Sequence, residues 1–266
     1  MFSPYYAWSR RRDPLDHCAV NVALYGPRGR RWAMTERGSA SLARSRDRLA
    51  IGASALSWDG AALTIDLDEV AAPIPRRIRG AVRVEPEFLH PDSFPLDAHG
   101  RHAWRPIAPA ARVSVALAAP DLTWRGHGYF DTNAGAESLS EGFSRWSWSR
   151  ATLAEGAAIL YDAERRDGGP ISLALRFDRT GRCESFAPPP LADLPRTRWR
   201  LPRRTRSEDG AAVVERDFED TPFYSRSLVS ARLFGEPAVS VHESLSLDRF
   251  DRALVRLMLP FRMPRR

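Results

Sequence analysis

The feature that most constrains the fold of this chain is the alternation of apolar and polar residues in several short segments. Alternate side chains of a β-strand point to opposite faces of the sheet, so this pattern is typical of strands that bury one face. Residues rich in Gly, Pro, Asp and Asn separate the segments and indicate turns. The alternating segments are residues 20–24, 63–67, 78–84, 112–117, 157–161 and 171–177.

Turn and helix signals indicate how these strands are connected. The pair Asp59-Gly60, shortly before segment 63–67, is a hairpin-turn signal. Helical patterns are few, and we predict helices only over residues 40–48 and 252–258. Short strands joined by turns predict an all-β chain folded as an antiparallel barrel or sandwich.

A proline-rich stretch indicates where the chain divides. Three consecutive prolines, Pro188 to Pro190, are followed by Pro195. Proline is stiff and donates no backbone hydrogen bond, so this stretch cannot pair into a central strand. We therefore predict a larger N-terminal domain over residues 1–190 and a smaller C-terminal β domain over residues 191–266.

The charge of the chain limits the classes of partner. The chain has 40 basic and 33 acidic side chains, a formal net charge of +7, and every basic side chain is Arg. A complete absence of Lys is typical of a coding bias toward Arg. No nucleic-acid recognition motif accompanies the charge, so we expect no nucleic-acid partner, whereas an anionic membrane surface stays open. Cys18 and Cys183 lie far apart in the sequence and follow no metal-binding spacing. They neither demand nor exclude an oxidising compartment, and a reducing cytoplasm is the simpler interpretation.

The familiar nucleotide and metal motifs are absent from the sequence. There is no P-loop, no dinucleotide-binding glycine fingerprint, no Gly-x-Ser-x-Gly elbow and no His-Glu-x-x-His pair. His99, His102 and His127 lack the helical spacing and the nearby carboxylates of a zinc site. We therefore expect neither a cofactor nor a metal.

The densest cluster of aromatic and polar residues spans residues 124–135, which read WRGHGYFDTNAG. Residues two apart on a strand project from the same face. A barrel that brings such pairs together would hold one carboxyl group among several aromatic rings. The alternative is structural, because Trp and Tyr fill β cores and an Asp at a strand end often caps a turn. The pairs in question are Tyr129 with Asp131, His102 with Trp104, and Trp146 with Trp148.

Blocks spread over nearly the whole chain resemble a known family in both sequence and order. They are FSPYYAW at 2–8, RWAMTER at 31–37, GHGYFDTNAG at 126–135, FSRWSWSR at 143–150, TPFYSR at 221–226 and HESLSLDRF at 242–250. These blocks are similar to those of the bacterial carotenoid 1,2-hydratases, also called hydroxyneurosporene synthases. The resemblance covers far more of the chain than any single motif does.

The resemblance implies a cofactor-independent lyase with two lipocalin-like β domains. Such an enzyme adds water to the terminal 1,2 double bond of an acyclic carotenoid, such as neurosporene or lycopene, on the route to the carotenoids of photosynthetic bacteria. The Tyr-x-Asp motif of the family falls on Tyr129 and Asp131, and its His-x-Trp pair falls on His102 and Trp104. Members also carry an aromatic segment before the block at 2–8. Either the start codon lies farther upstream than Met1, or the first domain lacks one or two N-terminal strands.

Hydration of an isolated alkene explains why an acid is needed. A proton must be donated to carbon, which produces a tertiary cation that water then attacks. Asp131 can donate only if it is protonated near neutral pH, so its pKa must lie well above its ordinary value of about 3.9. Burial in a cavity lined by hydrocarbon shifts the pKa of a carboxyl group in that direction.

The aromatic residues and the histidine then take the remaining roles. A fixed anion beside the cation would risk collapse onto it, so aromatic faces suit it better. We expect Trp104 and Tyr129 to stabilise the cation and Trp146 and Trp148 to bind the substrate. The alternative for Trp146 and Trp148 is core packing. His102 would orient the attacking water or accept its proton, or else hydrogen-bond Asp131.

The substrate also bears on the location of the protein. A carotenoid is longer than a small barrel is deep, so part of it must stay in the bilayer. We therefore expect a cytoplasmic protein that associates peripherally with the inner or photosynthetic membrane. The sequence leaves open the preferred carotenoid and the oligomeric state. Two other functions fit the same cavity, namely a non-catalytic carrier of an apolar isoprenoid and a polyene cyclase.

Overall fold

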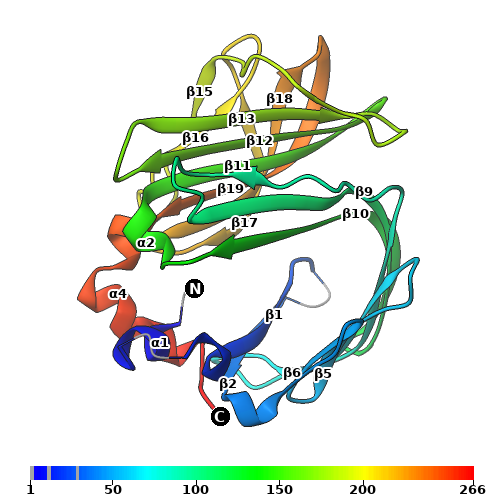
Figure 1. Ribbon diagram of the computed structural model, residues 1–266, viewed down its shortest axis with the longest axis vertical. Helices are drawn as coiled ribbons and strands as arrows, with labels where there is room; N and C mark the ends of the chain where they lie inside the picture. Colours follow the sequence, from blue (N-terminus) through cyan, green and yellow to red (C-terminus); the bar gives the residue numbers. More distant parts are fainter. Residues whose placement is uncertain (1–2, 11–12, 28–29) are drawn as a thin grey trace. The chain divides into compact units, whose positions relative to one another are not determined.

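The computed structural model describes residues 3–10, 13–27 and 30–266, and it consists mainly of antiparallel β-sheets (Figure 1). The predicted all-β class is thereby confirmed. Met1 and Phe2, at the start of the block at 2–8, lie outside the described residues. Of the helices in the described ranges, none has the length and apolar character needed to cross a membrane.

The chain forms two compact units that alternate along the sequence. Unit 1 comprises Met1–Pro86, Ala111–Gly128 and Ala253–Arg266, and unit 2 comprises Glu87–Ala110 and Tyr129–Arg252. Two long strands, β9 (His102–Ala119) and β10 (Asp121–Gly135), each contribute one end to each unit.

Unit 1 contains the N-terminal strands and the C-terminal helices. β9 and β10 continue a sheet in the order β10-β9-β7-β6-β5-β4-β3, and β1 pairs with β2 in a separate hairpin. Apolar residues that alternate along these strands form its core, including Val22, Leu67, Ile78 and Val115. The elements are α1 (Pro4–Trp8), η1 (Pro14–Asp16), β1 (Cys18–Leu24), β2 (Arg31–Arg37), η2 (Ser39–Ser41), β3 (Leu42–Arg44), β4 (Arg48–Ile51), β5 (Ser54–Trp58), β6 (Leu63–Val70), β7 (Arg77–Pro86), α4 (Ala253–Met258) and η3 (Leu259–Phe261).

Unit 2 contains a seven-stranded sheet in the order β14-β13-β12-β11-β19-β18-β17. A two-stranded sheet, β15 with β16, and the short strand β8, which pairs with β9, complete it. The elements are β8 (Phe94–Pro95), α2 (Leu139–Gly142), β11 (Phe143–Leu153), β12 (Gly156–Arg165), β13 (Pro170–Phe177), β14 (Cys183–Ser185), β15 (Leu191–Leu194), β16 (Arg203–Arg206), β17 (Val213–Asp220), β18 (Tyr224–Leu233), β19 (Glu236–Ser246) and α3 (Leu247–Phe250).

Each alternating segment of the sequence lies within a strand, in β1, β6, β7, β9, β12 and β13, so the six strand predictions are confirmed. The hairpin turn at Asp59-Gly60 is also confirmed. It joins β5 to β6, and Asp59 Oδ1 accepts hydrogen bonds from the backbone N–H groups of Ala61 and Ala62 at 2.9 and 2.7 Å. The helix over residues 252–258 is confirmed as α4.

The helix predicted over residues 40–48 is wrong. These residues form η2, β3 and the start of β4, and a tight turn joins the two strands. Ser45 Oγ donates a hydrogen bond to Asp47 Oδ1 at 2.7 Å, and the Ser45 N–H bonds the Arg48 carbonyl at 2.8 Å. Ser and Asp stabilise turns through such local hydrogen bonds, which here outweigh the helical pattern.

The domain boundary predicted between residues 190 and 191 does not coincide with the two units, because it falls inside unit 2. β19 follows this boundary in the sequence but pairs with β11, which precedes it, from Arg145↔Ser246 to Thr152↔Val239. The prolines Pro188–Pro190 themselves are not in a strand, and the following β15 pairs only with β16. Hydrogen bonding between distant segments, which a break in composition does not reveal, thus joins both sides of the proline stretch.

A buried ion pair in unit 1 leads to a test of stability. The Glu69 side chain is completely buried, and it accepts hydrogen bonds from Arg37 Nη2 at 2.8 Å and Ser54 Oγ at 2.7 Å. We expect Arg37→Leu to lower the free energy of unfolding by about 3–5 kcal/mol, because it leaves the Glu69 charge buried without its cation. Urea unfolding measures this change. The double variant Arg37→Leu/Glu69→Leu should be more stable than Arg37→Leu alone, and equal or lower stability would contradict the account.

Candidate active site

A partly buried carboxyl group with two hydrogen-bond donors forms the centre of the candidate site in unit 2. Asp131 Oδ2, on β10, accepts hydrogen bonds from Trp104 Nε1 and from the Tyr129 hydroxyl, each at 2.8 Å. Tyr129 precedes Asp131 by two residues, so both side chains leave the same face of the strand. Trp104 reaches the same oxygen from the neighbouring strand β9. The structure thus brings together three of the predicted site residues.

The surroundings of Asp131 favour its protonated form. Burial raises its pKa above the ordinary value of 3.8, and the hydrogen bonds from Trp104 and Tyr129 oppose this shift without cancelling it. The negative charge of Glu243 on β19 raises the pKa further. Burial, together with the charge of Asp131, also raises the pKa of the Tyr129 hydroxyl, so that group stays a neutral donor.

The two donors leave the second carboxyl oxygen for chemistry. Both hydrogen bonds that the described residues donate to Asp131 end on Oδ2. An oxygen that accepts two hydrogen bonds is disfavoured as the site of the acid proton, since that proton would meet two donors. When Asp131 is protonated, Oδ1 is therefore the favoured position of the proton, because no described residue donates a hydrogen bond to that oxygen.

Aromatic rings surround this carboxyl group. The ring of Tyr129 lies 5.0 Å from that of Trp148, and the ring of Trp104 lies 5.5 Å from that of Tyr161. Trp146 lies farther out, with its ring centroid 6.3 Å from Tyr161. Trp104 is fully buried and Tyr161 nearly so. The carboxyl group thus lies in a cluster of aromatic side chains, two of which contact it through their hydrogen-bond donors.

The register of β11 and β12 explains why these rings meet. Trp148 pairs with Tyr161 across the two strands, and Trp146 pairs with Ala163. Trp146 and Trp148 alternate with serines, so their rings share one face of the sheet with Tyr161. The sequence analysis did not single out Tyr161. It lies in a predicted strand, but only the pairing of β12 with β11 shows which face it occupies.

His102 lies among residues at the ends of neighbouring elements. Its ring packs edge-on against Phe143 at 5.0 Å, and its Nε2 lies 3.4 Å from Glu137 Oε1. Gly135 and Gly142 lie so close that a Cβ on either would come within 2.8 Å of the ring. Of the contacts that the described residues make, none joins the His102 ring to Asp131. The ring is therefore held at the junction of β10, α2 and β11.

A further acidic residue near the site was missed in the sequence analysis. Glu243 pairs with Trp148 across β19 and β11, and it accepts hydrogen bonds from Arg226, whose Nε lies 2.9 Å from Glu243 Oε1. Its charge acts on Asp131 from the neighbouring sheet. The only signal in the sequence was its place in the block at 242–250, which assigned no role to it.

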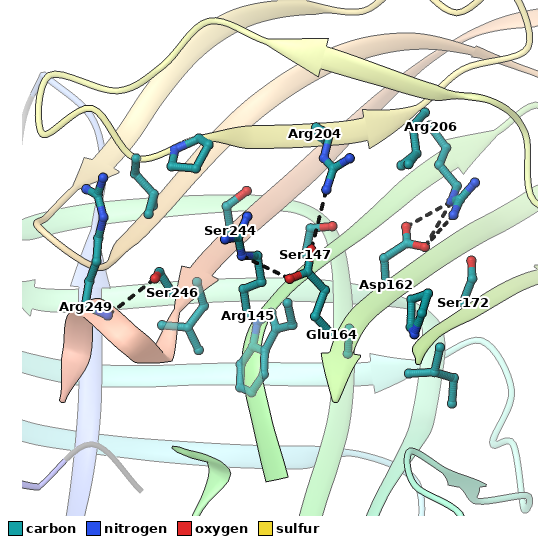
Figure 2. A pocket seen from close by; sticks show the side chains of 18 residues that line it. Arg145, Ser147, Asp162, Glu164, Ser172, Arg204, Arg206, Ser244, Ser246 and Arg249 are labelled. Carbon is teal, nitrogen blue, oxygen red and sulfur yellow. Dashed lines mark hydrogen bonds and ion pairs between the residues drawn. The ribbon is translucent and has the colours of Figure 1, made fainter. Parts of the chain in front are cut away.

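The opposite face of the same strands lines a polar cavity of about 350 Å³ (Figure 2). Asp162 holds Arg206 through three hydrogen bonds of 2.7 to 3.0 Å, and Glu164 lies 3.2 Å from Arg145 and 3.5 Å from Arg204. Ser244 and Ser172 have buried hydroxyl groups without a partner among the described residues. A hydrocarbon chain would leave these polar groups unsatisfied, so the cavity does not suit a carotenoid.

The two predicted substrate-binding residues, Trp146 and Trp148, differ in their position relative to the two faces of the sheet. Trp146 borders the polar cavity, while its ring contacts Tyr161 on the face toward Asp131. Trp148, by contrast, contacts Tyr129 directly. Trp148 therefore lies closer to the centre of the candidate site than Trp146 does.

The histidines considered as metal ligands lie apart. His99 Nε2 is 3.9 Å from Asp167, His102 faces Glu137, and His127 belongs to the part of β10 in unit 1. Over residues 3–10, 13–27 and 30–266, no three His, Cys, Asp or Glu side chains are grouped as a metal ion would require.

The raised pKa of Asp131 predicts a pH-dependent stability. A carboxyl group whose pKa is higher in the folded than in the unfolded state stabilises the fold below its unfolded pKa, and this contribution is lost as the pH rises through the folded pKa. We expect Asp131→Asn, which keeps an acceptor for Trp104 and Tyr129, to unfold at higher urea concentration than the wild type at pH 8. At about pH 4 the difference should shrink.

A matched control shows whether the change in stability comes from removing a carboxyl group shielded from solvent or from removing any carboxyl group of the unit. Asp193→Asn changes an exposed residue on β15 of the same unit. If Asp131→Asn gave the same stability difference at both pH values, the carboxyl group would not be destabilised by its burial.

The fold resembles that of a solved structure. A crystal structure of a protein described as AttH, from Nitrosomonas europaea, matches this chain with a TM-score of 0.56, over 80% of this chain and 74% of the other. The sequence identity is 13%, so the likeness concerns the fold alone. It confirms the predicted lipocalin-like class.

Comparisons of sequence are more specific. An acyclic carotenoid 1,2-hydratase of Thiocapsa roseopersicina is 57% identical over 271 residues, which cover 100% of this chain and 67% of that protein. One of Rubrivivax gelatinosus is 50% identical with the same coverage, and one of Cereibacter sphaeroides is 42% identical, with 95% of that protein covered. The model of the carotenoid hydratase CrtC family matches residues 1–266. With the whole chain matched, this protein belongs to the carotenoid hydratase CrtC family.

Proposed function

We propose that this chain is an acyclic carotenoid 1,2-hydratase in which Asp131 is the general acid. The observation that carries the proposal is the Asp131 carboxyl group, which accepts hydrogen bonds from Trp104 and Tyr129 and whose pKa is raised by its removal from solvent. The similar proteins described as acyclic carotenoid 1,2-hydratases support the reaction class. Neurosporene and lycopene are the proposed substrates, because both end in the trisubstituted double bond that this acid would protonate.

The first step is proton transfer to carbon. The proton on Asp131 Oδ1 moves to C-2 of the terminal double bond, whose π electrons form the new C–H bond. C-1 becomes a tertiary cation and Asp131 becomes a carboxylate. Trp104 and Tyr129 both donate hydrogen bonds to Oδ2, so they stabilise the negative charge as it develops.

The cation at C-1 is stabilised by rings instead of by a second anion. Trp104 and Tyr129 contact Asp131 through their Nε1–H and hydroxyl groups, and the rings of Tyr161 and Trp148 lie 5.5 and 5.0 Å from theirs. The cation would lie over the faces of rings in this cluster. A cation over an aromatic face in a desolvated site gains about 2 kcal/mol or more. Of the two proposed substrate-binding residues, Trp148 should therefore contribute more to stabilising the cation. Trp146 extends the same aromatic face.

The second step is the attack of water on C-1. A new C–O bond forms, and the oxonium that results loses a proton to the Asp131 carboxylate. The acid is thereby restored, and the sum of the two steps is alkene plus water giving a tertiary alcohol. No oxidant, reductant or cofactor is needed for this balance.

We propose that His102 is a positioning residue in this site. Its ring is packed against Phe143 and faces Glu137, and it lies two residues before Trp104 on the same strand. By fixing the end of β9, it would hold the Trp104 indole in line with Asp131. This role differs from that of a general base, which requires hydrogen-bond reach to the attacking water.

The substrate places the enzyme at a membrane surface. An acyclic carotenoid is dissolved in the bilayer, so the protein must take up one end of it there. We propose peripheral association with the inner or photosynthetic membrane from the cytoplasmic side. A carrier of apolar isoprenoids would also meet this requirement, but it gains nothing from a buried acid, whose desolvation is costly.

Replacing the acid tests the proposal directly. We expect Asp131→Asn to lower the rate of carotenoid hydration by about 10²–10⁴-fold, the usual contribution of a general acid. The amide keeps an acceptor for Trp104 and Tyr129 but has no acidic proton. The assay uses neurosporene or lycopene under anaerobic conditions, with chromatography and mass spectrometry of the products.

The outcomes of this assay separate the three candidate functions. Wild-type protein that binds lycopene without forming alcohol would be a carrier, and a cyclised product of unchanged mass would identify a polyene cyclase. A folded Asp131→Asn variant that retained most of the hydration rate would contradict the role of Asp131.

A second variant tests the hydrogen bond from Tyr129. Hydration requires protonated Asp131, so the rate should fall as the pH rises through the pKa of this group. The hydrogen bond from the Tyr129 hydroxyl stabilises the Asp131 carboxylate, so Tyr129→Phe should raise the pKa of Asp131 and move the fall in rate to higher pH. The maximal rate should drop about tenfold, because a hydrogen bond to a charged group is lost.

Tyr161→Phe is the matched control for this pH profile. It removes a hydroxyl group from the same aromatic cluster, but that hydroxyl makes no hydrogen bond to Asp131 among the described residues. A shift of equal size in both variants would show that the effect does not depend on the Tyr129 hydrogen bond.

A further inference from the structure

The C-terminal part of unit 1 exposes an unusual group of large apolar side chains. Leu254, Leu257, Met258 and Phe261 lie in α4 and η3, and they are 69%, 63%, 42% and 74% exposed. These four residues form what we call the α4–η3 surface. Single exposed apolar residues are common, but four within eight positions form a patch, and such patches mark contact sites.

The rest of the segment is fixed to unit 1, so the exposure is not that of a frayed end. The Glu36 N–H donates to the Pro264 carbonyl, and the Arg266 N–H donates to the Glu36 carbonyl, each at 2.9 Å. Val255, Leu259 and Met263 follow at intervals of four residues and are buried. One side of the segment therefore anchors it, and the α4–η3 surface is the side left outward.

The charge of the segment is entirely positive. Residues 253–266 contain Arg256, Arg262, Arg265 and Arg266 and no Asp or Glu. The Arg262 guanidinium lies over the Trp32 ring, 4.3 Å from its centroid, and Arg265 bonds Asp16 and Glu36. Apolar side chains flanked by Arg on a short helix are typical of segments that lie in a membrane interface.

An exposed aromatic residue also lies in α1. The Arg265 backbone hydrogen-bonds Tyr5, which places α1 beside the end of the segment. Trp8, at the end of α1, packs edge-on against Tyr5 at 5.6 Å and is 52% exposed. Trp side chains are favoured at the level of lipid headgroups.

We propose that the α4–η3 surface, with Trp8 beside it, is the element by which this protein binds an anionic lipid bilayer. The inference rests on the membrane association proposed above and assigns it to named residues. The four apolar side chains enter the boundary between headgroups and acyl chains, and the exposed Arg266 meets the anionic headgroups. Basic side chains near such a surface attract it, and the attraction weakens with salt.

A second copy of the chain is a less suitable occupant. Two copies meeting at this surface would bring the exposed Arg266 of both segments together, and the segment itself contains no acidic residue. Four side chains on a short segment also cover much less than the roughly 800 Å² per partner of a stable interface. A bilayer supplies both the apolar layer and the negative charge.

The test is flotation of the full chain with vesicles that contain no carotenoid. We compare vesicles of phosphatidylcholine alone with vesicles in which about 30 mole percent of the lipid is anionic phosphatidylglycerol. We expect binding to the anionic vesicles that falls as salt rises. Leu254→Ser/Leu257→Ser/Phe261→Ser should reduce the bound fraction about tenfold or more, since it removes most of the exposed apolar area.

The matched control changes exposed apolar residues elsewhere. Val213→Ser/Val239→Ser alters side chains of unit 2 that are 60% and 48% exposed, and it should float like the wild type. Circular dichroism and thermal unfolding check each variant. If the triple variant does not fold, Leu257→Glu, at a single position that is 63% exposed, replaces it and should also lose binding.

Three results would overturn the inference. They are a wild type that does not float with anionic vesicles, a triple variant that floats as well as the wild type, and a wild-type dimer that the triple substitution converts to monomer. Hydration of carotenoid in detergent micelles is measured in parallel. A triple variant that keeps this activity but loses flotation supports the inference, and the failure of Asp131→Asn to change activity would count against the proposed function only.

Discussion

The removal of one carboxyl group from water is the constraint on which the candidate site depends. Burial disfavours the charged form of Asp131, and the hydrogen bonds from Trp104 and Tyr129 oppose that effect only in part. A carboxyl group in water would be ionised at neutral pH and could not protonate an alkene. The same donors become useful once the proton has left, because they then stabilise the carboxylate. Both hydrogen bonds end on Oδ2, so the proposed proton transfer would start from Oδ1.

The alternation of side chains along β11 and β12 gives this sheet two chemically different faces. Trp146, Trp148 and Tyr161 lie on the face toward Asp131, and the residues between them, such as Ser147 and Asp162, line the polar cavity. A shift of the register by one residue would exchange the two faces and replace the rings near the acid with hydroxyl and carboxylate groups. The pairing of these strands is therefore as important to the site as the identity of its residues.

Membership of the carotenoid hydratase CrtC family and the geometry of the site support the same reaction class, but they do so independently. The family rests on similarity over the whole chain, whereas the acid rests on distances, burial and charge around Asp131. The α4–η3 surface adds a feature of another kind, since it concerns how the protein reaches an apolar substrate. It lies in unit 1, and its role can be tested without any reference to catalysis.

Local patterns in the sequence determined much of the secondary structure, and the resemblance to the carotenoid hydratases indicated Asp131 as the candidate acid, with Tyr129 and Trp104 as its neighbours. Alternation revealed six strands, and the spacing of Tyr129 and Asp131 showed that they share a face, because both depend only on residues close together in the chain. The helix expected over residues 40–48 failed where Ser45 and Asp47 form a turn. Tertiary structure decided what depends on distant segments, namely the pairing of β19 with β11, the place of Tyr161 and Glu243 beside the site, and the packing of His102 against Phe143. It also decided which side of α4 remains exposed, because burial depends on the whole fold and not on the segment alone.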